Sequence, residues 1–389
     1  MQSIKVQVNP GLLKWARENV GATIEEVHHK TKFKKEDLVA WEKGEDYPRI
    51  TQLRNLSRVY KKALSFFLLP QPPTKDPVPI PKELRTISSK KGIHFSYKTF
   101  VAFNRANTMR LITKELAENL NHRIERKFEY VTIQTDPETL ANKYRDKLAL
   151  SFQQQKAWRD GYEAFDHIRP MIEGEGILVT QSSFPLDEAR GFTLLDKECP
   201  LIVINTKDSI NGRMFTLIHE FAHAILNVSD IFLYGDEDDF TDGHRTTEKF
   251  CNQFAGAFLV PAKDLLNHPL VKGISKSTQW DDLTLSTLSR NFKVSKEAIL
   301  RRLVTLNLAT KQHYEKKRKE WEDFLKTLPK RKGGGRSEPP RDCIKNNGKT
   351  VVSLVLDNYR NGFIRETDVS AYLDIKPKHL PLVEALVGS

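Results

Sequence analysis

Residues 215–227 read FTLIHEFAHAILN. His219 and His223 are four residues apart, so a helix places both imidazoles on one face, one turn from each other. Glu220 lies between them and can face a water beside a bound ion without binding the ion itself. Apolar residues fill most other positions of the stretch, which predicts a buried helix. Because buried polar groups are costly without partners, this helix predicts a metal site.

A third ligand is needed, since a catalytic zinc usually has three protein ligands and one open position. Our candidate is Glu248, which opens a second apolar helix in the stretch TTEKFCNQFAGAFLVP, residues 246–261. Two other sources remain open, namely His244 and the acidic loop at residues 235–239. Glu248 could also be an ordinary glutamate that the helix dipole favours at a helix N-terminus.

The chemistry expected at this site follows from the types of its residues. The sequence contains no Cys-x-x-Cys pair, so a metal site must use histidines and carboxylates. Two histidines and one glutamate suit Zn2+, our expected cofactor, and also accept manganese or iron. Zinc lowers the pKa of a bound water to about 7. Glu220 would take the proton from this water as it attacks a peptide carbonyl and pass it to the leaving amine.

The residues around these two stretches mix helical and strand patterns. Runs rich in β-branched and aromatic residues predict strands at 176–181, 190–196 and 200–205. Such a mixture is typical of an α+β fold with a small, mostly antiparallel sheet. Helical periodicity surrounds the strands at residues 137–150, 156–173, 211–227, 245–259 and 282–307.

The N-terminal residues predict a compact helical module. Its helices are bounded by N-cap, capping-box and glycine signals. A proline-rich stretch, PQPPTKDPVPIP, then forms a stiff connector that no helix can cross. The helix signals are Asn9-Pro10, Gly21, Thr23 with Glu26, and Gly44.

The chain divides into five predicted segments. Residues 1–70 form the N-terminal module, and residues 71–136 form the linker and a long connecting helix, predicted over 98–127. Residues 137–310 carry the metal site. Residues 311–349 form a charged helix that runs into a flexible linker, and residues 350–389 form a tail of small helices.

Composition limits the classes of protein to which this chain can belong. A net charge of +12 and a pI of about 9.4 favour anionic partners, nucleic acid first. The three cysteines are widely spaced, which fits a reducing compartment better than a disulfide framework. No apolar run is long enough for a bilayer and no signal peptide is evident, so we expect a cytoplasmic protein without membrane contact.

Two separated motifs resemble the ImmA/IrrE family of bacterial and phage metallopeptidases. These are PLIVINTKDSINGRMFTLIHEFAHAILN (200–227) and EKFCNQFAGAFLVP (248–261), and the likeness extends over about residues 140–310. The resemblance implies a zincin-like domain that binds zinc and cleaves a DNA-binding repressor protein in a phage, mobile-element or stress circuit. The matching positions are Asn205, Phe215, Thr216, Leu217, His219, Glu220, His223, Glu248, Asn252, Phe254, Ala255, Leu259, shifted by one residue, and Pro261.

Residues 10–60 resemble a Cro-repressor-like (XRE) helix-turn-helix, in the spacing of Thr23-x-x-Glu26-Val27 and Trp41-Glu42-x-Gly44-x-x-x-Pro48. The helix that would read double-stranded DNA begins with lysines and then acids, and the acids would be repelled by phosphates. Protein binding or dimerisation therefore remains an alternative to DNA contact. The candidate DNA-binding residues are Lys32, Lys34 and Lys35.

A second helix-turn-helix pattern lies at residues 284–310, where Ser295 would cap a helix that bears Lys296, Arg301 and Arg302. This segment could equally pack beneath the peptidase core. A peptide substrate is expected to add as a strand to a sheet edge, either at Arg190–Leu195 or at Leu201–Asn205.

Two functions from different classes follow. The first is a zinc endopeptidase that acts on a protein regulator, with the N-terminal module as a tether. The second is a DNA-binding regulator or antitoxin-like protein whose peptidase fold senses a metal or a partner without cleaving. A role in a toxin–antitoxin pair rests on the family resemblance alone.

Overall fold

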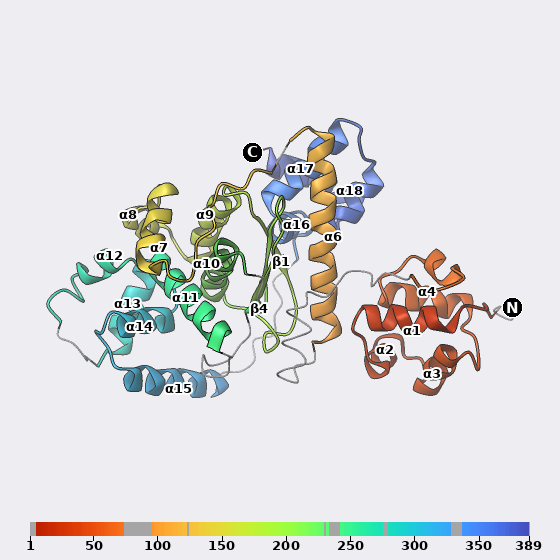
Figure 1. Ribbon diagram of the computed structural model, residues 1–389, viewed down its shortest axis with the longest axis horizontal. Helices are drawn as coiled ribbons and strands as arrows, with labels where there is room; N and C mark the ends of the chain where they lie inside the picture. Colours follow the sequence, from red (N-terminus) through yellow and green to blue (C-terminus); the bar gives the residue numbers. More distant parts are fainter. Residues whose placement is uncertain are drawn as a thin grey trace. The chain divides into compact units, whose positions relative to one another are not determined.

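The computed structural model describes residues 5–73, 95–122, 124–228, 231–232, 242–274, 279–327 and 337–388. The chain forms two units (Figure 1). The first comprises Met1–Asn107 with Ser183–Glu188, and the second comprises Thr108–Ser182 with Ala189–Ser389. Helix α6 (Tyr97–Asn119) begins in the first unit and ends in the second.

Up to residue 73, the described part of the first unit forms four short α-helices, whose ends lie at the predicted signals, followed by a 3-10 helix. Asn9 accepts a hydrogen bond from the Gly11 amide, and Thr23 and Glu26 form the predicted capping box. Gly44 ends the third helix in the left-handed conformation, with φ of 77°. The elements are α1 (Pro10–Asn19), α2 (Ile24–Thr31), α3 (Lys35–Lys43), α4 (Ile50–Val59) and the 3-10 helix η1 (Leu64–Leu68).

The beginning of α6 belongs to the core of this first unit. Tyr97 packs in the same apolar cluster as Val27 and Trp41, and its hydroxyl donates to the main-chain oxygen of Val59. Gly21 has φ of 61°, and a Cβ there would overlap the ring of Phe100, so the close approach of α6 requires glycine. The helix predicted over 98–127 is therefore partly buried, and it ends at Asn119 instead of continuing to residue 127.

A small mixed sheet lies at the centre of the second unit, in the strand order β1-β3-β2-β4. Strand β1 pairs with β3 in parallel, whereas β2 pairs with β3 and with β4 in antiparallel fashion. This agrees with the predicted α+β fold and its mostly antiparallel sheet. The strands are β1 (Leu178–Ser182), β2 (Gly191–Leu194), β3 (Leu201–Asn205) and β4 (Ile231–Phe232).

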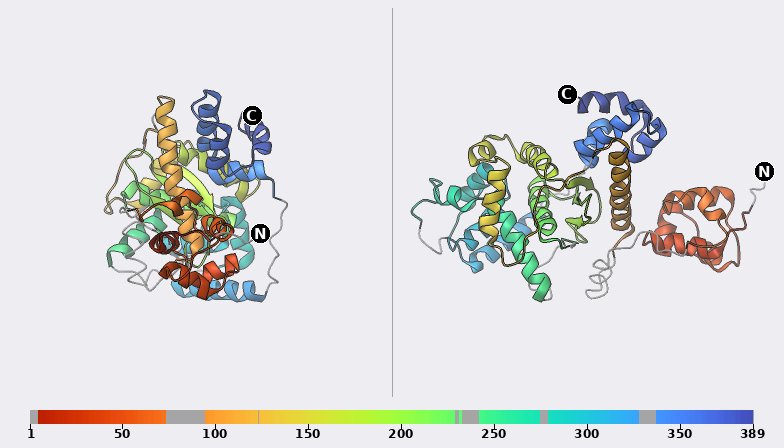
Figure 2. Two further views of the ribbon diagram at one scale, coloured as in Figure 1. Left: turned by 90° about the vertical axis from the view of Figure 1, so that its right-hand side faces the viewer. Right: turned by 45° about the horizontal axis from the view of Figure 1, so that its top comes forward.

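Helices pack against this sheet and against one another in one apolar core. Figures 1 and 2 show α10 (Ile210–Leu226) along one face of the sheet. The helical pattern predicted over 282–307 is two helices, because Lys293 is left-handed and Ser295 caps the second one. The remaining helices of this part are α7 (Pro137–Lys147), α8 (Phe152–Ala157), α9 (Gly161–Glu173), α11 (Asp242–Leu259), α12 (Ala262–Leu266), α13 (Asp282–Phe292), α14 (Lys296–Thr305) and α15 (Lys311–Thr327).

The C-terminal helices pack beside β1, the outer strand of the sheet. The main-chain oxygen of Lys345 accepts hydrogen bonds from Arg169 and from Gln181, at 2.6 and 2.9 Å. Among the described residues, no helix is both long and apolar enough to cross a membrane. The C-terminal elements are α16 (Pro339–Asn347), α17 (Lys349–Arg360), α18 (Glu366–Leu373), the 3-10 helix η3 (Pro377–His379) and α19 (Leu380–Val387).

Candidate metal centre

The turn from β3 into α10 is held by side chains at its corner. Asn205 donates to the main-chain oxygen of Ala189 and accepts from the amide of Lys207, at 2.9 and 3.0 Å. Ser209 then caps α10 by accepting from the amide of Gly212. These contacts explain an asparagine at the end of the strand, and they set the start of the helix that carries both histidines.

Three side chains meet between α10 and α11. The Nε2 atoms of His219 and His223 are 3.1 Å apart. The carboxylate of Glu248 lies 3.3 Å from His219 Nε2 and 3.1 Å from His223 Nε2. One ligand atom from each residue falls within 4.8 Å of the other two, and all three residues are buried. The structure thus brings together the three residues that the sequence predicts as ligands.

The chemistry of these three residues fits a metal ion. A neutral imidazole that carries its proton on Nδ1 presents Nε2 as an acceptor, so two such atoms at 3.1 Å repel each other unless a cation lies near both. Burial disfavours the charged forms, yet the mutual attraction of these groups outweighs it. The two histidines hold the pKa of Glu248 far below its usual range, and contacts with the Cys251 thiol and then with Glu248 raise the pKa of His223 above its usual range. A cation bound here would satisfy the same carboxylate.

Glu220 points towards the sheet and is completely buried. The hydroxyl of Thr193, on β2, lies 2.6 Å from Glu220 Oε2 and donates a hydrogen bond to it. The carboxylate is thus held beside the cluster without being one of its three members. Sequence reasoning missed Thr193, because no motif or spacing relates residue 193 to residue 220.

Cys251 is a second residue that sequence reasoning missed. It lies on α11, one turn after Glu248, and its buried thiol interacts with His223. Burial raises the pKa of this thiol to about 11, so it is protonated at neutral pH. The spacing of residues 248 and 251 in the stretch EKFC indicates that they share one helix face. Nothing in the stretch indicates which histidine Cys251 contacts.

Polar side chains hold the C-terminal end of α11, the helix that carries Glu248. Arg145 donates to the main-chain oxygen of Phe258 at 2.7 Å, and Gln155 donates to that of Leu259 at 2.8 Å. Arg302 donates to the next carbonyl at 2.8 Å. Donors at a helix C-terminus satisfy carbonyls that lack partners within the helix, and cations there also suit its dipole.

The other two sources considered for the third ligand lie outside the side chains that the structure describes. The acidic loop at residues 235–239 lies outside the described residues. His244 falls within α11, but its side chain also lies outside what the structure describes.

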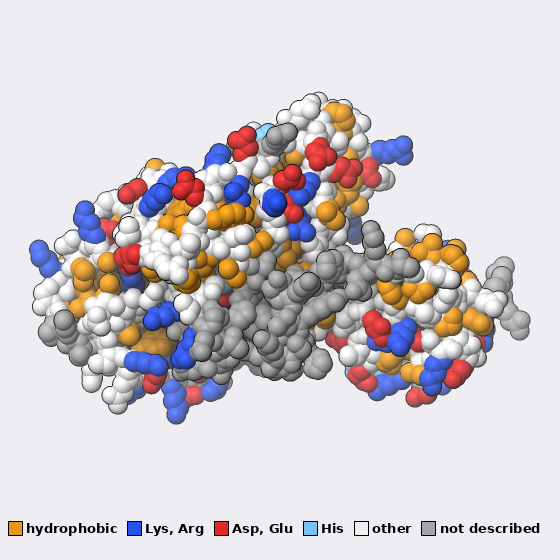
Figure 3. All heavy atoms as spheres, in the orientation of Figure 1, with side chains coloured by type: hydrophobic (Ala, Val, Ile, Leu, Met, Phe, Trp, Pro, Cys, Tyr) orange, Lys and Arg blue, Asp and Glu red, His pale blue; other side chains and the backbone are white. Residues whose placement is uncertain are grey.

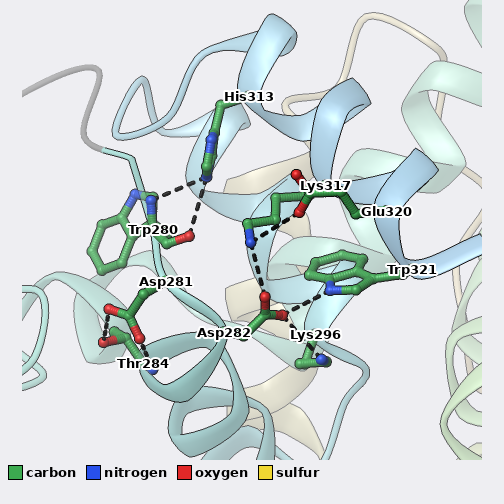
Figure 4. A network of polar contacts seen from close by, with 9 residues as sticks. All are labelled: Trp280, Asp281, Asp282, Thr284, Lys296, His313, Lys317, Glu320 and Trp321. Atoms are coloured by element: carbon green, nitrogen blue, oxygen red, sulfur yellow. Dashed lines mark hydrogen bonds and ion pairs between the residues drawn. The ribbon is translucent and has the colours of Figure 1, made fainter. Parts of the chain in front are cut away.

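The second helix-turn-helix pattern uses basic residues for internal contacts. Arg302 is buried and forms a two-bond ion pair with Glu138, with both distances 2.6 Å. Lys296 contacts Asp282, which also accepts from Lys317 and Trp321 of α15 (Figure 4). These contacts support packing of the segment against its neighbours rather than a role in reading DNA.

The lysines singled out at the N-terminal module lie on its surface. Lys32 and Lys34 are exposed just before α3, whereas Lys35 forms an ion pair with Glu25 of α2. Acidic and basic side chains are intermixed on the face of the module that Figure 3 presents. Positive charge available to phosphates at this end of α3 is therefore smaller than the lysine count indicates.

The residues of the site lie within the part of the chain that matches a protein-family model. Residues 172–304 match the peptidase M78 family, described as an IrrE N-terminal-like domain. This range contains His219, Glu220, His223 and Glu248, and it begins well after the N-terminal module. No curated protein matches the chain significantly. The match supports a domain of metallopeptidase type around the cluster described above.

Proposed function

We propose that this chain is a zinc-dependent endopeptidase. The observation that carries the proposal is the convergence of His219, His223 and Glu248 in a buried cluster, with the Glu220 carboxylate beside it. The match of residues 172–304 to a metallopeptidase family supports it independently. Zinc is preferred because two histidines and one carboxylate form one of its usual catalytic ligand sets.

His219, His223 and Glu248 would hold the ion through two imidazole nitrogens and one carboxylate. When bound, zinc polarises a peptide carbonyl and lowers the pKa of a water to about 7. Glu220 acts as the general base, accepting a proton from the attacking water and delivering it to the leaving amine. The burial of Glu220 keeps bulk water from competing for this carboxylate.

The sheet limits where a peptide substrate can add as a strand. Strand β3 is paired on both sides, so Leu201–Asn205 is excluded as an edge. Strand β2, within the alternative Arg190–Leu195, runs beside α10 and pairs with β4 only at Gly191 and Phe192, within the residues that the structure describes. We therefore assign substrate pairing to the remainder of the β2 edge, next to Glu220.

The proposed substrate is a regulatory protein, namely a DNA-binding repressor. A protein substrate fits a site at which an extended backbone can pair with β2. The N-terminal module would bring the peptidase to such a target, either on DNA or through direct contact with the regulator. This part of the proposal rests on the family resemblance and on the presence of the four-helix module.

The test compares the zinc-loaded protein with its Glu220→Gln variant on a peptide library made from a bacterial lysate. Mass spectrometry of new N-termini should reveal cleavage by the wild type and a loss of at least about 100-fold in the variant. Zinc content should be the same in both, because Glu220 is not in the ligand cluster. Equal cleavage by the variant would contradict the proposed role of Glu220.

The second candidate function is a DNA-binding regulator that does not cleave. The observation that favours it is the four-helix module, with exposed Lys32 and Lys34 before α3. If the module binds duplex DNA, fluorescence anisotropy at about 50 mM salt should detect binding that weakens steeply towards about 200 mM. Lys32→Glu with Lys34→Glu should abolish it, whereas Lys43→Glu at the far end of α3 should have a smaller effect. Equal losses of DNA binding from both changes would exclude Lys32 and Lys34 as the DNA-binding surface.

A further inference from the structure

Strand β2 approaches α10 unusually closely at Gly191. A Cβ at this position would lie 2.6 Å from Thr216 Cγ2 and 2.8 Å from the main-chain oxygen of Val203. A side chain is therefore incompatible with this packing, and only glycine lets the strand backbone reach the helix. This close approach brings the next residue on the same strand face within reach of the helix.

That residue is Thr193, since side chains two positions apart in a strand point to the same side. Its Oγ1 lies 2.6 Å from Glu220 Oε2 and 3.1 Å from the main-chain oxygen of Glu220. Thr193 is 2% exposed and Glu220 is fully buried, so water does not compete for this contact. One hydroxyl thus links the sheet to a single glutamate of α10.

We infer that Thr193 is a positioning residue that holds the Glu220 carboxylate in its working orientation. The inference rests on the proposed function, because it presumes that Glu220 acts beside a bound metal. A glutamate side chain has several rotatable bonds, and ordering it costs conformational entropy. A short hydrogen bond to an ionised carboxylate offsets this cost and fixes the direction of one oxygen. The other oxygen then faces a defined direction when a water or ligand binds.

A matched control lies one helical turn before Glu220. Thr216 is also a buried threonine at the interface between β2 and α10. Within the described residues, however, its hydroxyl has no hydrogen-bond partner. Thr193→Val and Thr216→Val therefore remove the same group from the same interface, but only the first removes a contact with Glu220. Thr193→Ser keeps the hydroxyl and removes a methyl group.

The experiment uses the full chain loaded with Co2+, whose visible spectrum reports ligands added to the metal. The probe is acetohydroxamic acid, which binds a metal through two oxygens and shares its acidic proton with a neighbouring carboxylate. Thr193→Val should weaken hydroxamate binding by about 3- to 10-fold. This is less than the roughly 10- to 100-fold loss of metal affinity or activity that follows mutation of residues that orient metal ligands directly. Thr193→Ser and Thr216→Val should stay within about 2-fold of the wild type, and Co2+ affinity should be unchanged in all three.

A double-mutant cycle separates positioning of Glu220 from a general effect on packing. In a Glu220→Ala background, Thr193→Val should cause no further loss of hydroxamate affinity, because the group on which it acts is gone. Equal losses from Thr193→Val and Thr216→Val, or an undiminished loss in the Glu220→Ala background, would overturn the inference. A wild type that binds no metal would instead overturn the proposed function. A wild type that binds metal and hydroxamate without any effect of Thr193→Val would overturn the inference alone.

Discussion

At the residue scale, the His223 imidazole of the cluster favours its protonated form when no metal is present. Burial opposes the charged form of His223, but its contacts with Cys251 and then with Glu248 raise its pKa above the usual range. A metal ligand must offer an unprotonated nitrogen, so an incoming ion has to displace this proton. Protons and metal therefore compete for the same atoms.

The resulting prediction concerns the pH dependence of metal binding. The raised pKa of His223 favours its protonated form in the metal-free site. A lower pH therefore strengthens the competition of protons with the metal ion. Zinc affinity should rise from pH 6 to pH 8, by up to about tenfold per pH unit for each proton released. Competition with a chromophoric chelator measures the affinity, and calorimetry in two buffers measures the protons. An affinity that is independent of pH, with no proton release, would contradict this description.

The residues of the site differ in how far the sequence could predict them. His219, Glu220 and His223 follow from helical spacing. Glu248 was predicted as the carboxylate that opens an apolar helix, but the helix begins at Asp242, so Glu248 lies within it. Thr193 could not be predicted, because its contact with α10 depends on the close approach of two segments that are distant in sequence. Local patterns carry no information about such contacts.

At the element scale, α11 is held at two places by different means. Within the helix Glu248 faces the two histidines, and at its C-terminal end three side chains donate to successive main-chain oxygens. Arg145 is buried, and burial lowers its pKa to about 10, so it remains charged at neutral pH. The position of the third ligand thus depends on residues far from the cluster.

Gln155 provides a test of this anchoring. Its side chain donates to the main-chain oxygens of Leu259 and Phe292, at 2.8 and 2.7 Å, and so ties α11 to α13. Gln155→Leu should lower the free energy of unfolding by about 1–3 kcal/mol, because buried carbonyls lose their donor. Urea unfolding of the metal-free protein measures the change. Gln153→Leu, on the exposed side of the same helix, should stay within about 0.5 kcal/mol, and an equal effect would contradict the anchoring role.

Element boundaries were predictable where a capping residue marks them. Asn9, Thr23, Gly44 and Ser295 all lie at helix ends in the structure, because their side chains or backbone satisfy terminal groups locally. The C-terminal region was less predictable. Helix α16 begins before residue 350, and its docking beside β1 depends on Arg169 and Gln181, which are more than 160 residues away.

At the scale of the whole molecule, the chain combines a four-helix module with a domain that matches a metallopeptidase family. The division into two units falls within α6, whose first half completes the core of the N-terminal module. Charge alone was a weak guide to function. The excess of +12 includes residues such as Arg302, which is buried in an ion pair and unavailable to any partner.

The central claim is that His219, His223 and Glu248 bind one metal ion. Its most direct test is the metal content of the purified full chain, measured by mass spectrometry after supply of zinc and removal of excess. The wild type should contain about one zinc per chain, and His219→Ala and Glu248→Ala should each lose it or bind it at least about 100-fold more weakly. Circular dichroism should show that both variants remain folded. No zinc in the wild type, or full zinc in the Glu248→Ala variant, would contradict the proposed ligand set.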